Sequence, residues 1–201
     1  MKLIQLFAFL AALLALTVEG HAAPGKTIAN LNKAYRGESN AGYRYEQFAK
    51  KAESEGYAQV AKLFRAAAKA EGIHRDSHKA AIIRMGGKPD EFALDDVKVG
   101  ATKENLAAAI KGETYERDVM YPEFLKAAKE DQASPAIRTF TYALAAETEH
   151  AKLYQEALNT LGNNHVTSIY VCPVCGYTVT ALPDRRCPVC ATAKEKFIVF
   201  E

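Results

Sequence analysis

The sequence lacks an excess of charge of either sign. Among its 201 residues, 26 Lys and Arg stand against 24 Asp and Glu, and the formal net charge is +2. Acidic and basic residues alternate along the chain, whereas a nucleic-acid-binding protein gathers basic residues on one face or in one run. The charge pattern therefore gives no support to nucleic-acid binding or to an acidic substrate. The 49% hydrophobic and 25% charged contents are those of an ordinary globular protein.

Long apolar runs are also scarce, and the prominent one lies at the N-terminus. Lys2 is followed by the apolar run 3–18 and then by small residues up to Ala23. This is the three-part pattern of a secretory signal, with cleavage after Ala22 or Ala23. The alternative is an uncleaved membrane anchor, for which the run is short because a spanning helix needs ~20 apolar residues. We expect residues 1–22 to be a signal peptide and the protein to be exported, to the periplasm, with no membrane association after cleavage.

Cysteine is rare, and the four cysteines lie close together. Cys172 and Cys175 form one Cys-x-x-Cys pair, and Cys187 and Cys190 form a second. Each pair points two thiolates at one place, so together they predict a tetrahedral four-sulfur metal site. Spacing alone does not separate iron from zinc. Disulfides are the alternative, because export would expose the cysteines to an oxidising compartment.

The rest of the chain shows helical periodicity. Apolar and small residues recur at helical spacing in four segments: 28–55, 57–85, 102–131 and 134–161. Pro122 lies inside the third segment and should kink it. Residues 167–201 have no helical period and are rich in β-formers, Cys, Pro and Gly. About 35 residues bury too little surface to fold without a metal or a disulfide. We therefore predict a mainly α protein with domains at 23–165, a four-helix bundle, and 166–201, a small β module.

Carboxylates and imidazoles recur within the apolar stripes of these helices. The second and fourth segments each contain Glu-x-x-His, whose two side chains share one helix face. The first and third segments supply further carboxylates. An unpaired buried carboxylate costs several kcal/mol, so such a set requires cations among it. Oxygen ligands with two imidazoles suit iron or manganese better than structural zinc. We therefore predict a two-metal site inside the bundle, formed by Glu38, Glu71, His74, Glu113, Glu116, Glu147 and His150.

These motifs together resemble the rubrerythrin family. The resemblance rests on Gly37-Glu38-Ser39, the two Glu-x-x-His pairs, residues 112–116 (Gly-Glu-Thr-Tyr-Glu), residues 120–122 (Met-Tyr-Pro) and the cysteine pairs. It covers nearly all of the chain after the N-terminal segment. It implies a ferritin-like di-iron bundle followed by a rubredoxin-like domain whose single iron changes oxidation state. Ala191 departs from the family, where many such knuckles have Gly.

The resemblance also implies roles for individual residues. Glu71 and Glu147 would bridge two irons. One iron would move between Glu116 in the oxidised state and His74 in the reduced state. The terminal ligands would be Glu38, Glu113 and His150.

Three further residues lie near this set in the sequence. Tyr45 follows Glu38 by seven residues and Tyr121 follows Glu116 by five, so both tyrosines could approach the metals. Core packing alone is the alternative for each. His78 lies one turn beyond the second Glu-x-x-His pair, and we expect an outer position around the metals or a surface position.

The implied function is that of a non-haem di-iron peroxidase in oxidative-stress defence. Hydrogen peroxide would be reduced to water, with electrons delivered through the four-cysteine iron by an unidentified redox protein. The resemblance implies a homodimer in which the tail of one subunit lies beside the di-iron site of its neighbour. The first alternative is a ferroxidase or iron-handling protein that uses the same site. The second is an electron-transfer or zinc-stabilised module with an inert bundle.

Overall fold

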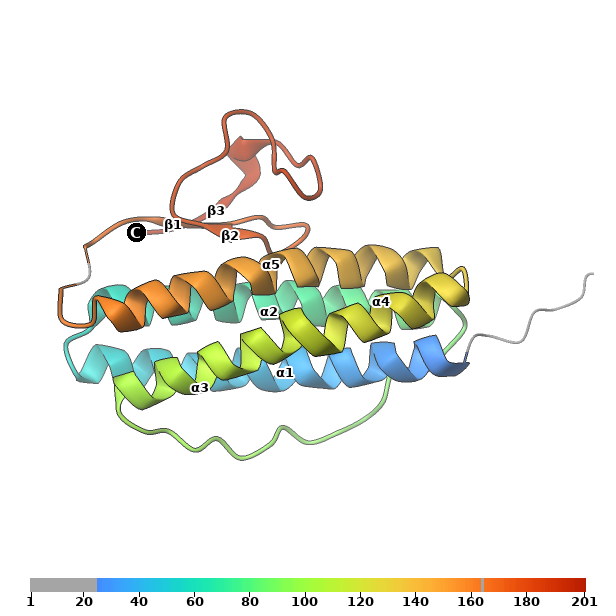
Figure 1. The fold of residues 1–201 in the computed structure, drawn as a ribbon, viewed down its shortest axis with the longest axis horizontal. Helices are drawn as coiled ribbons and strands as arrows, with labels where there is room; N and C mark the ends of the chain where they lie inside the picture. The colour runs from blue at the N-terminus through green and yellow to red at the C-terminus, as the bar shows by residue number, and fades with distance from the viewer. Residues whose placement is uncertain (1–24, 164) are drawn as a thin grey trace, which may run out of the picture.

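The computed structural model describes residues 25–163 and 165–201. The predicted signal peptide, 1–22, lies outside the described residues. Long helices lie side by side in a bundle, and a small β module covers one side of it (Figure 1). Within the described part of the chain, no helix has both the length and the hydropathy needed to cross a bilayer.

The described helices follow the predicted segments closely. Three of them match a predicted segment to within a few residues at each end: α1 (Gly25–Ser54), α2 (Ala58–Arg84) and α5 (Ser134–Asn159). The turn between α1 and α2 contains Gly56, whose φ of +82° is readily adopted only by glycine. Pro135 lies in the first turn of α5, where its missing N–H leaves no hydrogen bond unmade.

The third predicted segment is not one kinked α-helix. It consists of α3 (Thr102–Tyr115), a π-helical turn η1 (Glu116–Met120) and α4 (Tyr121–Glu130). The N–H of Tyr121 bonds to the carbonyl of Glu116, five residues back, which widens the turn just before Pro122. Pro122 then falls in the first turn of α4, where it is tolerated. The irregularity predicted at Pro122 is therefore a wide turn that precedes it, at the level of Glu116.

The bundle core has two apolar parts with a polar layer between them. One part contains Phe48, Phe64 and Tyr154, and the other contains Phe124 and Phe140. On α1, α2, α3 and α5 the residues between these parts include predicted metal ligands. Alanines fill much of the remaining interior and let the helices approach closely. The two apolar parts therefore exclude water from both ends of the polar layer.

A long loop, residues 87–101, joins α2 to α3 along the outside of the bundle (Figure 1). Asp95 fixes it to α1, because its carboxylate accepts hydrogen bonds from Arg36 at 2.8 Å and from Asn40 at 2.9 Å. The ring of Phe92 packs edge-on against Tyr35, with centroids 5.2 Å apart. These contacts hold the loop against α1, and we call it the strap.

In residues 165–201 the strands are β1 (Ile169–Val171), β2 (Thr178–Val179) and β3 (Ile198–Phe200). They form an antiparallel sheet in the order β2-β1-β3. The sheet lies on α2 and α5 of its own chain (Figure 1). The tail thus lies beside the site of its own bundle. Ile169 and Val171 of β1 join the core of the bundle, which explains this placement. The homodimer, with the tail of one subunit beside the site of its neighbour, stays a prediction.

Candidate metal centres

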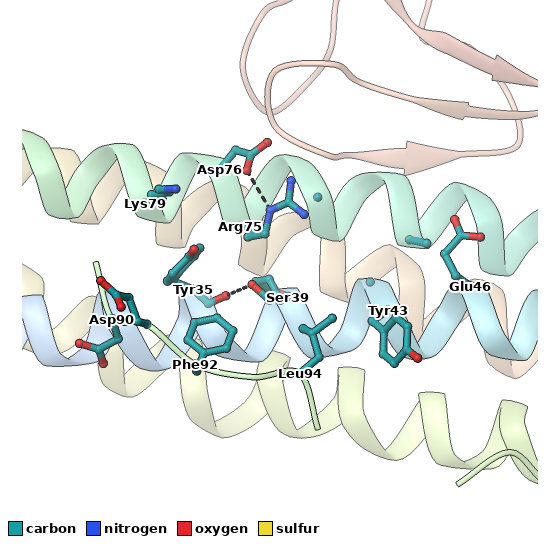
Figure 2. Close-up of a pocket in the computed structure, with 15 residues that line it drawn as sticks. Tyr35, Ser39, Tyr43, Glu46, Arg75, Asp76, Lys79, Asp90, Phe92 and Leu94 are labelled. Atoms are coloured by element: carbon teal, nitrogen blue, oxygen red, sulfur yellow. Dashed lines mark hydrogen bonds and ion pairs between the residues drawn. The ribbon is translucent and has the colours of Figure 1, made fainter. Parts of the chain in front are cut away.

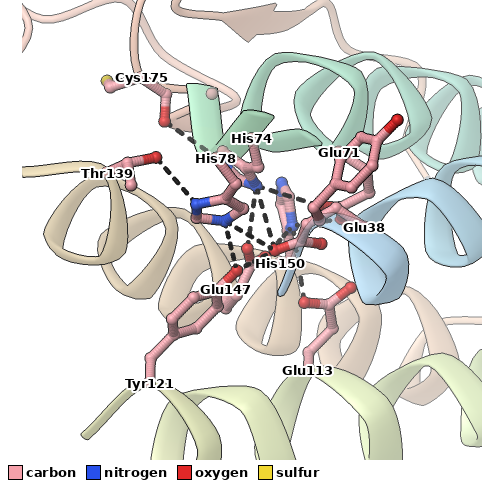
Figure 3. Close-up of polar contacts among 12 residues, drawn as sticks. Glu38, Glu71, His74, His78, Glu113, Tyr121, Thr139, Glu147, His150 and Cys175 are labelled. Atoms are coloured by element: carbon pink, nitrogen blue, oxygen red, sulfur yellow. Dashed lines mark hydrogen bonds and ion pairs between the residues drawn. The ribbon is translucent and has the colours of Figure 1, made fainter. Parts of the chain in front are cut away.

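Six of the seven predicted ligands, all except Glu116, converge at the middle of the bundle (Figure 3). Two groups of four side chains each place one ligand atom apiece within 4.8 Å of one another. Glu71 and Glu147 belong to both groups. The first group adds Glu38 and His74, and the second adds Glu113 and His150. This sharing is the arrangement expected of two metal ions bridged by two carboxylates.

Both imidazoles turn the same nitrogen toward the carboxylates. His74 Nδ1 lies 3.0 Å from an oxygen of Glu71 and 3.0 Å from an oxygen of Glu147. His150 Nδ1 lies 2.7 Å from Glu147 and 3.3 Å from Glu71. Nδ1 is therefore the nitrogen that each histidine offers to a metal.

The opposite nitrogens are held by the β module. His74 Nε2 lies 3.1 Å from the carbonyl oxygen of Cys175. A carbonyl only accepts, so Nε2 carries the hydrogen and donates it. His150 Nε2 lies 3.0 Å from the hydroxyl oxygen of Thr178, whose own hydrogen goes to the carbonyl of Gly176. Such outer hydrogen bonds fix the tautomer and orientation of ligating histidines. The β module thus holds both rings with Nδ1 toward the carboxylates, where a metal would bind.

Burial and neighbouring charges shift the pKa values of several titratable groups here. Burial and neighbouring carboxylates raise the pKa of Glu38 and of Glu113 well above the ordinary value. Burial lowers the pKa of His74, but the carboxylates of Glu147 and Glu71 outweigh it and raise that pKa to about 10. Burial raises the pKa of Glu147, yet the charges of His74 and His150 outweigh it and hold the pKa below its usual range. The buried carboxylates therefore have too few positive charges near them to balance their own negative charge.

The donor set fits bound cations. Among the described residues, several buried ligand atoms have no hydrogen-bond partner, although leaving such atoms unpaired costs about 1–3 kcal/mol each. They are Glu38 Oε2, Glu71 Oε1, Glu113 Oε2, both carboxylate oxygens of Glu147 and His150 Nδ1. Two cations among them would supply both the missing partners and the missing charge.

Glu116 is the predicted ligand that belongs to neither group of four. It begins η1 and is half-buried. Burial and the charge of Glu113 raise its pKa well above the ordinary value. The structure therefore gathers the set that contains His74, which the resemblance assigns to the reduced state. The exchange between Glu116 and His74 stays a prediction.

Two tyrosines hold the terminal carboxylates. Tyr45 donates a hydrogen bond to Glu113, and Tyr121 donates one to Glu38. Both rings are buried. Each hydroxyl thus satisfies one carboxylate oxygen and leaves the other unpaired, which fits a carboxylate that binds a metal through one oxygen.

His78 is fully buried, so its predicted surface alternative is wrong. Its Nε2 lies 3.0 Å from the hydroxyl of Tyr121, and its Nδ1 lies 3.0 Å from the hydroxyl of Thr139. Tyr121 gives its only hydrogen to Glu38, so His78 Nε2 donates to Tyr121 and Nδ1 accepts from Thr139. Burial and the charge of His74 lower the pKa of His78 to about 3, which keeps the ring neutral.

Sequence analysis missed three polar residues around the centre. Thr139 lies eight residues before Glu147 on the same helical stripe, so periodicity could have indicated it. Tyr154 is buried with its hydroxyl unpartnered, and its ring centroid lies 5.5 Å from that of Tyr45. Thr178 has no signal in the sequence, because only the packing of the β module brings it to His150.

The four cysteines form the second centre. Their sulfur atoms lie within 4.8 Å of one another, with Cys172 and Cys190 at 3.4 Å and Cys175 and Cys187 at 3.5 Å. These separations far exceed the ~2.05 Å of a disulfide bond, and all four thiols are free. A hydrogen bond from Cys175, with backbone N–H groups, lowers the pKa of Cys172 to about 4. The geometry favours a metal over disulfides.

The two knuckles turn through left-handed residues. Gly176 has φ +74° and Ala191 has φ +61°. A Cβ on Gly176 would lie 2.2 Å from Nε2 of His74, so only glycine permits this contact between the two centres. Ala191 stands where many members of the family have Gly. Its left-handed conformation costs an alanine more free energy than it would cost a glycine.

The fold and sites define a class: a helical bundle with a carboxylate-bridged di-iron site, joined to a four-cysteine rubredoxin-like site. Family comparisons agree. The family described as Rubrerythrin matches residues 29–158, and that described as Rubrerythrin, rubredoxin-like domain, matches 170–198. The chain belongs to the rubrerythrin family, and it is an oxidoreductase by that membership.

Similar proteins extend over nearly the whole chain. Rubrerythrin-2 of Clostridium acetobutylicum is 37% identical, covering 85% of this chain and 94% of that relative. Nigerythrin of Nitratidesulfovibrio vulgaris is 34% identical, covering 92% of each. A solved structure of nigerythrin in a mixed-valent state has a TM-score of 0.81 at 33% identity, covering 92% of this chain and 96% of that one. A fully reduced, all-ferrous nigerythrin has a TM-score of 0.79 at 31% identity, covering 100% of both.

Proposed function

We propose that this protein is a peroxidase that reduces hydrogen peroxide to water in oxidative-stress defence. The observation that supports this most is the direct hydrogen bond between the cysteine module and the di-iron site of the same chain, from His74 to the carbonyl of Cys175. A site that only oxidised and stored iron would need no such connection. Two ferrous ions, when bound, supply the two electrons that the O–O bond takes up.

The surrounding residues hold the ligands in place and exclude water. Tyr45 and Tyr121 orient the terminal carboxylates of Glu113 and Glu38. Reduction of one peroxide to two waters also consumes two protons. A buried site needs a route for them, since bulk water does not reach it.

The chain Thr139–His78–Tyr121–Glu38 provides such a route. Each hydroxyl or N–H in it donates toward Glu38, so a proton shift along the chain delivers a proton at the Glu38 carboxylate. Thr139, at the outer end, lines a surface groove of about 200 Å³ together with Val174 of the β module. The neutral imidazole of His78 can accept at Nδ1 while it donates from Nε2.

The proposal includes an external electron donor, a redox protein that reduces an iron held by the four cysteines. It also includes export to the periplasm, on the pattern of residues 1–22, and assembly as a homodimer. Export would place that donor outside the inner membrane. The contact of the β module with its own bundle means that electrons need not cross between subunits.

The decisive experiment replaces one cysteine ligand. Cys172→Ser should lose the cysteine-bound iron and abolish steady-state peroxide reduction with an external donor. The pre-reduced di-iron site should still be oxidised once by peroxide. Val174→Ser, in the same knuckle but 47% exposed and not a ligand, should behave as the native protein.

The alternatives give different results. Steady-state turnover that survives Cys172→Ser would support a ferroxidase instead. Peroxide consumption unchanged by Glu71→Ala would mean that the bundle is inert. Either result would overturn the proposed peroxidase.

A further inference from the structure

A groove of about 770 Å³ lies between α1 and α2, beside the strap that joins α2 to α3 (Figure 2). We call it the α1–α2 groove, defined by Ser39, Gly42, Glu46, Gly72, Asp76 and Glu91. Glu38 also lines it, although this carboxylate is only 1% exposed. Its Oε2 has no hydrogen-bond partner among the described residues. The groove therefore ends at the residue that carries an unpartnered ligand atom of the di-iron site, with the carboxylate itself buried behind the groove wall.

Small residues keep the groove open. A Cβ added to Gly72 would have no heavy atom within 4 Å. A Cβ on Gly42 would lie 3.5 Å from the Cβ of Glu71, so this glycine faces a bridging ligand across the gap. Neither glycine has a positive φ. Glycine inside a helix costs about 1 kcal/mol relative to alanine, so the backbone does not favour it at these two positions. What the two glycines contribute is the space that a side chain would fill.

Acidic side chains outnumber basic ones along the groove. The carboxylates at its mouth are Glu46, Asp76, Asp90 and Glu91. The cations are Arg75 and Lys79, and both have other contacts: Arg75 pairs with Asp76 at 2.8 Å, and Lys79 lies 6.0 Å from the ring centre of Tyr35. A cleft lined by one sign of charge concentrates ions of the opposite sign.

We propose that the α1–α2 groove is the route by which divalent metal ions reach the di-iron site. The acidic mouth attracts the cation, the glycines leave it room, and the free oxygen of Glu38 receives it. Hydrogen peroxide is neutral and gains nothing from these charges. The proposal depends on the di-iron site and is independent of the peroxidase activity.

The test measures metal loading in the full chain rather than turnover. Metal-free protein is mixed with Co²⁺ without oxygen, samples are quenched with chelator, and the retained metal is counted over time. Cobalt bound to thiolates absorbs strongly, so loading of the cysteine site is followed separately as an internal control. Gly72→Leu should slow loading of the bundle by roughly tenfold, because the ion must pass a side chain that has to move aside. The final amount bound should equal that of the native protein.

The control is Gly37→Leu, another helical glycine with nothing within 4 Å and outside the groove. It should load at the native rate. A second variant covers any misfolding of Gly72→Leu. Glu46→Gln with Glu91→Gln should slow loading roughly three- to tenfold at low ionic strength, with the difference lost at high salt. Its control, Glu123→Gln with Glu130→Gln, removes exposed carboxylates of α4.

Native-rate loading in the double Gln variant at low salt would overturn the proposal. Equal slowing in Gly37→Leu would overturn it as well, since the effect would then not belong to the groove. Slowed loading of the bundle with unchanged loading of the cysteines would support it.

Discussion

The two metal centres of this chain are built in opposite ways. The cysteine centre draws its ligands from residues 172–190, and each knuckle is closed by its own backbone, as in the bond from the N–H of Gly176 to the carbonyl of Cys172. The di-iron centre draws its ligands from residues 38–150, on separate helices. A local site forms wherever its short loops form. A distributed site exists only when the whole bundle packs.

The two centres also differ in how far their ligand atoms have partners when no metal is bound. The four cysteines are free thiols whose sulfur atoms contact one another in two pairs, Cys172 with Cys190 and Cys175 with Cys187. The carboxylates of the bundle are buried with raised pKa values and unpaired oxygens. The contact between His74 and Cys175 joins these two unlike sites, and the following predictions test how independent they are.

The largest effect is expected from Glu147→Ala. Glu147 belongs to both ligand groups and lies within 3.0 Å of His74 Nδ1 and 2.7 Å of His150 Nδ1. The bundle should lose the metal of both groups, while the cysteine-bound metal should stay. Metal analysis of purified protein, with the visible spectrum of the cysteine iron, measures both. Glu149→Ala, two residues further along α5 and outside both ligand groups, should keep all metal, since among the described residues Glu149 pairs only with Lys152 at 4.0 Å. Loss of the cysteine iron in Glu147→Ala would show that the two centres are not independent.

Gly176→Ala should separate the centres without emptying either one. The new Cβ would collide with His74 Nε2, so the knuckle must move away and the bond from His74 to Cys175 should break. We expect oxidation of the reduced cysteine iron by peroxide to slow by at least roughly tenfold. A rise of about 1.4 kcal/mol in the activation free energy, caused by the lost contact, already gives that factor. Stopped-flow absorbance of the cysteine iron measures this rate.

Gly56→Ala is the matched control for that substitution. Gly56 has a φ of +82°, similar to the +74° of Gly176, but a Cβ there meets nothing within 4 Å. It therefore carries the same backbone cost without the collision. If both variants transferred electrons equally fast, the contact with His74 would not matter.

His78→Leu tests the layer behind the di-iron ligands. The substitution removes the link between Thr139 and Tyr121 but leaves the ligands unchanged. Iron content should be native, and single-turnover oxidation by peroxide should slow by roughly a hundredfold, at the low end of what a lost proton-transfer group costs. The solvent isotope effect on that rate should change as well. His165→Leu, an exposed histidine, should alter neither quantity. An unchanged isotope effect in His78→Leu would exclude the proton route.

The smallest effect is expected from Ala191→Gly in the cysteine module. Ala191 has φ +61°, which costs an alanine about 1–2 kcal/mol, while glycine loses about 0.5–1 kcal/mol through the freedom of its unfolded chain. The variant should therefore be more stable by about 0.5 kcal/mol. Thermal loss of the cysteine iron spectrum measures it. Ala193→Gly should instead be less stable than the native protein. Ala193 has φ −62°, so the substitution relieves no backbone strain and adds only the entropic cost of glycine.

Much of this architecture was predictable because its rules are local or periodic. Helical spacing placed α1, α2 and α5 to within a few residues, since which residues face inward follows from 3.6 residues per turn. The same periodicity brought Glu71 and His74 to one face. The Cys-x-x-Cys pairs identified the second centre, because each pair forms its own knuckle.

The tertiary structure decided what no period or short motif encodes. The wide turn at Glu116 precedes Pro122, and no spacing or motif in the sequence marks it. The burial of His78 depends on Tyr121 and Thr139, which come from other helices.

By itself, the sequence determined which residues could bind metal and which faces they share, because backbone geometry within one helix or one knuckle is the same in any fold. Only the tertiary structure decided that the cysteine module rests on its own bundle, with Cys175 and Thr178 holding the outer nitrogens of His74 and His150. Those contacts join residues far apart in the chain. They form through the burial of β1 against the bundle, a long-range packing event with no local signature.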